Sequence, residues 1–251
     1  MPADEEDVLG CGDGLPGMRE GAMLRILGLG FLFALAVSVT GAMAADAVLG
    51  GVSIKLPPPD GFCELAASYP ADNRALTAVG KVLESGGNKL LGMSADCRQL
   101  ADWRIGQRNF LDDYGQYQTP IAQMDQLVSS PRTMVSDTCA RMRTAGKAIA
   151  DSLTPSLQSI IEHAVKTVKM NSMSFAGVLA EDQTACYAAE VQNLTTETGT
   201  EKIQLGLLGV TVVKNKSVYA YRFSIYTPSV DVKGQLAKLQ SAVASLQAAN
   251  K

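Results

Sequence analysis

Apolar and polar residues alternate along several stretches of the chain, and this period of two is typical of half-buried strands. Strands are therefore expected within 51–59, 89–98, 113–119, 173–180, 185–193, 202–213 and 217–226. Elsewhere apolar residues recur every three or four positions, as on one face of a helix. Helices are expected at 71–85, at 229–248 and, as a helical pair divided at Thr154-Pro155, at 131–168. Because tightly connected strands pair antiparallel, this order predicts an α+β fold with an antiparallel β-sheet covered by helices. The C-terminal helix should pack on that sheet.

Two of these stretches allow more than one interpretation. Around Cys97 the alternation favours a strand at 89–98, but a helix capped by Ser94 would also place the apolar residues on one side. In 202–213 the apolar positions change parity between Leu207 and Val210, which a β-bulge near Gly209 would reconcile. Lys214-Asn215-Lys216 is a natural hairpin turn between the last two strands.

The N-terminal region has the character of a targeting segment. Residues 23–44 contain a basic start, an apolar run and a small-residue cleavage motif, which are the parts of a secretory signal peptide. The apolar run, 26–39, is shorter than the ~20 residues of a membrane span. We therefore expect cleavage at Ala44/Ala45, one mature domain at 45–251 and no transmembrane segment in the mature chain. The acidic stretch 1–22 is expected to be a disordered start-site extension.

Removing this leader changes the charge balance. Of the 22 basic and 25 acidic residues, the leader contains two and six, which leaves 20 and 19 in the mature chain. Such a balance gives no reason to expect a nucleic acid or another strongly charged partner.

Four cysteines remain after cleavage, and an even number in an exported protein indicates a disulfide framework. Four cysteines allow three pairings. We expect Cys63–Cys97, which would join the segment after the first strand to the next one, and Cys139–Cys186, which would join the inserted helix to the sheet. Because there is no C-x-x-C motif and only one histidine, neither a redox site nor a metal site is expected.

The order of elements resembles the PsbP-like (Mog-type) α/β/α sandwich group. The residues that carry this resemblance are VSIKLPPPDGF at the start, the hairpin at 202–226 and the helix at 229–248. The inserted helical pair departs from the group's usual pattern. The resemblance implies a non-catalytic accessory or binding module, and it assigns no functional residue.

Few residues suggest catalytic chemistry. His163 follows an acidic residue on a helix and could serve as a general base, although a boundary position is the simpler interpretation. Asp96, Asp102, Asp112 and Asp113 could supply paired carboxylates, but interleaved arginines favour a solvated, self-neutralising surface. The aromatic row Tyr219, Tyr221 and Phe223 could line a ligand groove, but we expect it to pack under the C-terminal helix.

These features predict an exported, non-catalytic binding or accessory protein of the bacterial envelope, periplasmic or secreted, with no cofactor. Its expected partner is an envelope protein, and the sequence leaves the ligand and oligomeric state open. The alternative is a small periplasmic hydrolase that uses His163 or the Asp96–Asp113 carboxylates. An enzyme would need convergent polar groups in a concave site.

Overall fold

The computed structural model describes residues 45–164 and 168–251. The predicted extension 1–22 and signal peptide 23–44, and with them Ala44 of the cleavage point, lie outside the described residues. Within the described part, no helix has an apolar stretch long enough to cross a membrane.

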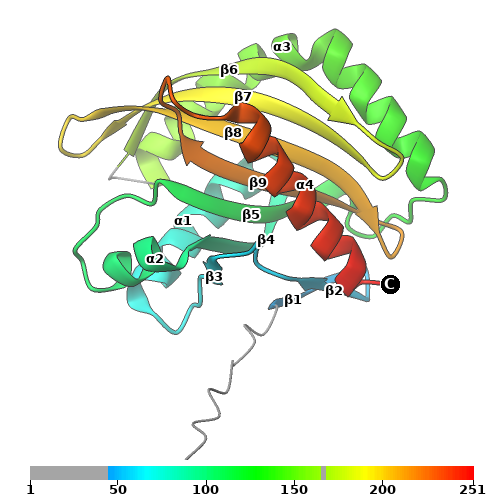
Figure 1. The fold of residues 1–251 in the computed structure, drawn as a ribbon, viewed down its shortest axis with the longest axis horizontal. Coiled ribbons are helices and arrows are strands. Elements are labelled where there is room, and N and C mark those ends of the chain that lie inside the picture. The colour runs from blue at the N-terminus through cyan, green and yellow to red at the C-terminus, as the bar shows by residue number, and fades with distance from the viewer. Residues whose placement is uncertain (1–44, 165–167) are drawn as a thin grey trace, which may run out of the picture. The chain divides into compact units, whose positions relative to one another are not determined.

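An antiparallel sheet of seven strands organises the fold (Figure 1). Its spatial order is β3 (Phe62–Glu64), β4 (Asn88–Asp96), β5 (Asp113–Pro120), β9 (Lys216–Ile225), β8 (Glu201–Val213), β7 (Ala185–Thr196) and β6 (Val168–Glu181). A separate hairpin consists of β1 (Ala45–Leu49) and β2 (Val52–Leu56). The helices are α1 (Pro70–Ser85), α2 (Cys97–Arg104), the short η1 (Ile121–Gln123), α3 (Pro131–Ala164) and α4 (Val232–Ala249). The predicted α+β class, with the C-terminal helix on the sheet, is therefore confirmed.

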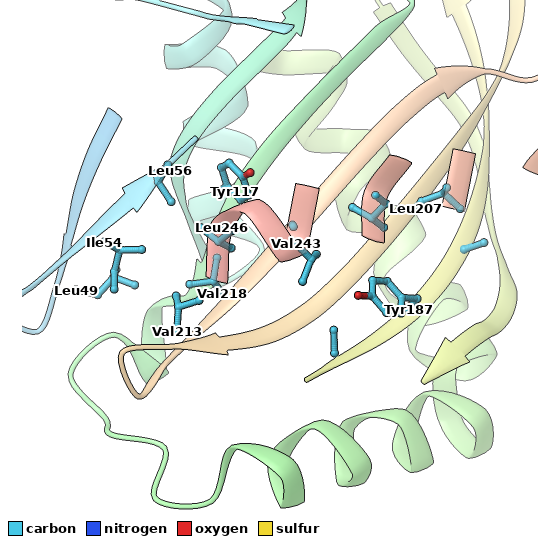
Figure 2. Packing of buried hydrophobic residues seen from close by; sticks show 14 of the residues in the cluster. Leu49, Ile54, Leu56, Tyr117, Tyr187, Leu207, Val213, Val218, Val243 and Leu246 are labelled. Atoms are coloured by element: carbon cyan, nitrogen blue, oxygen red, sulfur yellow. The ribbon is translucent and has the colours of Figure 1, made fainter. Parts of the chain in front are cut away.

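The main hydrophobic core lies between the sheet and α4. Leu239, Val243 and Leu246 of α4 are almost fully buried against apolar residues of β7, β8 and β9. The β1–β2 hairpin contributes Leu49 and Ile54 to the same core, as Figure 2 shows. Burying a Leu or Val side chain stabilises a fold by about 1.5–3 kcal/mol, so this layer is a main source of stability.

Helices α1 and α3 cover the opposite face of the sheet (Figure 1). The first packs on β4, and the second packs mainly on β6. Gly146 of α3 has no room for a side chain because the ring of Phe175 in β6 lies against it. Close packing of the long helix on the edge strand therefore depends on a glycine.

Each of the two predicted disulfides is present. The Cα atoms of Cys63 and Cys97 are 4.8 Å apart, and those of Cys139 and Cys186 are 5.5 Å apart. The first joins β3 to the start of α2, and the second joins α3 to β7. The cysteines of the second pair are both fully buried.

The predicted helical pair at 131–168 is wrong, because a single helix, α3, continues through Pro155 and ends at Ala164. Proline removes a backbone donor and normally interrupts a helix. Here Leu157 and Ile161, beyond the proline, pack in one cluster with Ala150, before it, against β6 and β7. We attribute the continuity of the helix to this packing, which offsets the lost hydrogen bond.

The structure also resolves the two ambiguous stretches. The strand predicted at 89–98 ends at Asp96, and the rival helix begins at Cys97 with Asp96 rather than Ser94 as its cap. No bulge occurs at Gly209, since β8 keeps an unbroken register with both neighbours. The parity change needed no bulge: Leu207 faces α4 and Val210 faces α3, and helices bury both faces.

Candidate functional site

The sheet face toward α1 and α3 carries a row of aromatic and polar residues in place of a continuous apolar surface. In register, Tyr114 of β5 pairs with Phe223 of β9, which pairs with Gly206 of β8, which pairs with Glu190 of β7. Directly paired residues of antiparallel strands point to the same face. The sheet therefore places a carboxyl group and two aromatic rings in one line.

The predicted location of the aromatic row under the C-terminal helix is wrong. Tyr219 packs in the cluster of α3, whereas Val218 and Ala220, on the other side of the same strand, pack in the cluster of α4. Because side chains alternate along a strand, Tyr221 and Phe223 also face away from α4. The row is thus part of the α1/α3 face.

Gly206 allows the central residues of this row to meet. A Cβ atom at Gly206 would lie 2.8 Å from Cγ of Glu190 and 3.0 Å from Cε1 of Phe223. The side chain of Glu190 and the ring of Phe223 therefore both lie over Gly206. Any larger residue at this position would displace one of them.

Three aromatic rings lie beside Glu190. The rings of Tyr114 and Phe223 are stacked with centroids 4.8 Å apart, and those of Tyr221 and Phe223 with centroids 5.7 Å apart. Burial raises the pKa of both tyrosines, and the nearby Glu190 adds to the effect. The phenols therefore stay neutral at physiological pH, and that of Tyr114 donates to Oε1 of Gln204 at 3.2 Å.

The Glu190 side chain is half-buried and lies beside Gln192, whose Nε2 donates to Oε1 of Glu190 at 2.6 Å. Burial raises the pKa of this carboxyl, against the smaller opposite effect of that hydrogen bond. No lysine, arginine or histidine among the described residues forms an ion pair with it.

Two amide groups on this face each have one atom without a partner. Nε2 of Gln204 and Oε1 of Gln116 are buried and form no hydrogen bond, and the two residues are only 1% and 8% exposed. Buried polar groups are normally paired, so unpaired atoms on one face indicate places for a ligand or ordered water. Gln204 accepts a hydrogen bond from the hydroxyl of Tyr114, and Gln116 lies directly opposite Tyr221 on the neighbouring strand.

An open pocket of about 510 Å³ lies at one end of this face. It is formed by the segment 123–130, by α3 from Thr133 to Ile149 and by Tyr219, which is two residues from Tyr221. Alternate residues of a strand point to the same face, so Tyr219 lies on the face that carries Tyr221 and Phe223. The pocket therefore adjoins the aromatic row.

Three of the four carboxylates singled out from the sequence have structural partners. Asp96 caps α2 by accepting from the backbone N–H groups of Arg98 and Gln99, each at 3.1 Å. Asp112 pairs with Arg108 and Lys202, and Asp113 pairs with Arg222. Asp102 lies within α2.

His163 is the penultimate residue of α3, and its side chain is not described. Among the described residues, no group of three or more His, Cys, Asp or Glu side chains could hold a metal ion.

Sequence reasoning missed Glu190, Tyr114 and Gln204 as a group. One signal was present: Glu190 is the single charged residue of the strand ACYAAEVQNLTT. Its neighbours come from other strands, and they lie close together only because of a strand register that cannot be inferred from the sequence.

No protein-family model, curated protein or solved structure matches the chain. The resemblance to the PsbP-like group therefore stays a prediction, and the function must be argued from the geometry.

Proposed function

We propose that this chain is an exported, non-catalytic binding protein of the bacterial envelope that takes a small molecule on the α1/α3 face. The ligand site consists of Tyr114, Glu190, Gln204, Tyr221 and Phe223. Export is supported by the signal-like leader and by the two disulfides, which persist in oxidising compartments.

The observation that carries the proposal is the set of unpaired polar groups on a largely buried aromatic face. Leaving a buried polar atom without a partner costs about 1–3 kcal/mol. A ligand that pairs with Glu190 and with the free amide atoms of Gln204 and Gln116 would recover this free energy. Binding sites typically combine apolar and aromatic walls with a few such polar groups.

The same groups are better suited to holding a ligand than to transforming one. A hydrolase needs a nucleophile, or a second acid–base group, within reach of the first. The described neighbours of Glu190 are amides, phenols of raised pKa and a phenyl ring. Binding is therefore proposed ahead of the hydrolase alternative.

A thermal-shift screen of the purified protein against a small-molecule library tests this function. A ligand at 100 times its Kd stabilises by about 2.7 kcal/mol, which raises Tm by about 5–10 °C in a domain of this size. Gly206→Ala should abolish the shift because it displaces Glu190, whereas the exposed Tyr226→Phe should leave it unchanged.

Two results would contradict the proposal. If ligands stabilise the wild type and Gly206→Ala equally, the site is elsewhere. If a bound compound is converted to product during incubation, the protein is an enzyme and the non-catalytic assignment is wrong.

A further inference from the structure

Among the described residues, the three most buried ion pairs each bring a cation, a carboxylate and an aromatic ring together. Arg104 binds Asp72 at 2.6 Å and lies 3.8 Å from the ring centroid of Tyr69. The same cation thus forms an ion pair with a carboxylate and a cation–π contact with an aromatic ring. Such a cation gains from the carboxylate charge and from the face of the ring.

The second and third examples lie farther along the chain. Lys202 binds Asp112 at 2.5 Å with its Nζ atom 4.8 Å from the ring centroid of Phe110. Arg222 binds Asp113 at 2.7 Å and lies 4.6 Å from the ring of Phe62. All three carboxylates are thereby neutralised by side chains of the protein itself.

Glu190 is a fourth carboxyl group in aromatic surroundings, and here the described residues supply no cation. Its neighbours are the rings of Phe223, Tyr114 and Tyr221, and its hydrogen-bond partner is the neutral amide of Gln192. A partly buried carboxylate without a cation is disfavoured, and burial accordingly raises the pKa of Glu190 above its ordinary value.

We infer that the missing cation is supplied by the ligand, and that this face binds an organic ammonium group between Glu190 and the rings of Tyr114, Tyr221 and Phe223. This inference rests on the proposed binding function and names the ligand class for the same site. The free acceptor Oε1 of Gln116 suits an N–H or O–H of such a ligand, and the free donor Nε2 of Gln204 suits an acceptor such as its hydroxyl oxygen.

Binding of a cation should also change the protonation of Glu190. The ammonium group stabilises the ionised form of Glu190 and lowers its pKa in the complex. Where the carboxyl of the free protein holds a proton, its O–H bond breaks on binding and that proton passes to the solvent. The protein releases no proton where Glu190 is already ionised or is replaced by an amide.

Isothermal titration with choline and its neutral isostere 3,3-dimethylbutan-1-ol tests the ligand class, since the two differ in charge at nearly equal shape. Wild type should bind choline at least about tenfold more tightly than the alcohol. Glu190→Gln should lose that preference, and the matched variant Glu181→Gln, on the neighbouring strand, should keep it. Titration at several pH values in buffers of different ionisation enthalpy should show proton release at the acidic end of the range for the wild type, and at no pH for Glu190→Gln.

Different results would contradict the ammonium inference and the binding function. Equal affinity for the alcohol, or unchanged choline binding by Glu190→Gln, overturns the ammonium inference. Ethanolammonium and putrescine extend the test to primary amines. If these and choline fail to bind while a neutral or anionic library compound gives a Tm shift that Gly206→Ala abolishes, the binding function stands and the ammonium inference is wrong. If no library compound binds, both are wrong.

Discussion

Removing the disulfide between Cys139 and Cys186 should destabilise the protein more than removing the one between Cys63 and Cys97. The bonds close loops with sequence separations of 47 and 34 residues. On the chain-entropy model both contribute about 4 kcal/mol, and the difference between them is only a few tenths. Loop length alone therefore predicts nearly equal losses.

The two variants should differ in stability because the two disulfides are buried to different extents. Cys139 and Cys186 are both 0% exposed and pack among Val135 and Val210, whereas the other pair is half-buried. Replacing the buried pair by alanine leaves a void, which adds about 1–2 kcal/mol to the entropic loss. The expected losses are thus about 5–6 kcal/mol for C139A/C186A and about 4 kcal/mol for C63A/C97A.

Urea unfolding measures this difference, because the chain has a single tryptophan, Trp103, whose fluorescence reports on the α2 region. Far-UV circular dichroism provides a second probe of the same transition. A loss of 5 kcal/mol should lower the unfolding midpoint by about 2 M. Equal midpoints for the two variants, or a loss below about 1 kcal/mol for C139A/C186A, would refute the reasoning about burial. Mild reduction of the native protein should also open Cys63–Cys97 first.

Three further predictions concern buried charges. Asp72→Asn should lower the free energy of unfolding by about 3–5 kcal/mol, measured by urea unfolding. Asp72 is fully buried, and the substitution leaves the positive charge of Arg104 without its carboxylate. Lys216→Met should cost about 2–4 kcal/mol and increase amide exchange in the segment 121–130, since the buried ammonium donates to two backbone carbonyls of that segment at 3.0 Å; unchanged exchange would contradict this role. Because burial raises the folded-state pKa of Glu190, the unfolded chain ionises first, and wild-type stability should fall as pH rises above the ordinary value of 4.5. Glu190→Gln should remove that part of the pH dependence of Tm, and an unchanged slope would show that Glu190 does not cause it.

Local patterns were sufficient for much of the fold. The alternation in 185–193 and 217–226 identified β7 and β9, and the apolar stripe of 229–248 identified α4. Of the three possible cysteine pairings, the one expected from the predicted elements is the one present. Hairpin β1–β2 was only half predicted, because AADAVLG lacks a clear alternation and its pairing through Gly50-Gly51 depends on glycines with positive φ.

The errors about Gly209 and Tyr219 share a physical origin. A strand covered by helices on both faces is apolar at odd and even positions alike, so Leu207 and Val210 gave no information about which helix covers which face. For the same reason Tyr219 was assigned to the wrong layer. The Glu190 group could not be predicted at all, because it requires the register of four strands and the empty space at Gly206.

The two faces of the sheet differ in composition. The α4 face is closed by one large apolar cluster, whereas the α1/α3 face combines smaller apolar clusters with buried polar atoms that have no partner. The Cys139–Cys186 bond fixes α3 over that second face, on the same strand as Glu190. With the proposed ligand site on that face, C139A/C186A should weaken ligand binding as well as stability, whereas C63A/C97A, whose disulfide lies at the β3 edge, should weaken stability alone.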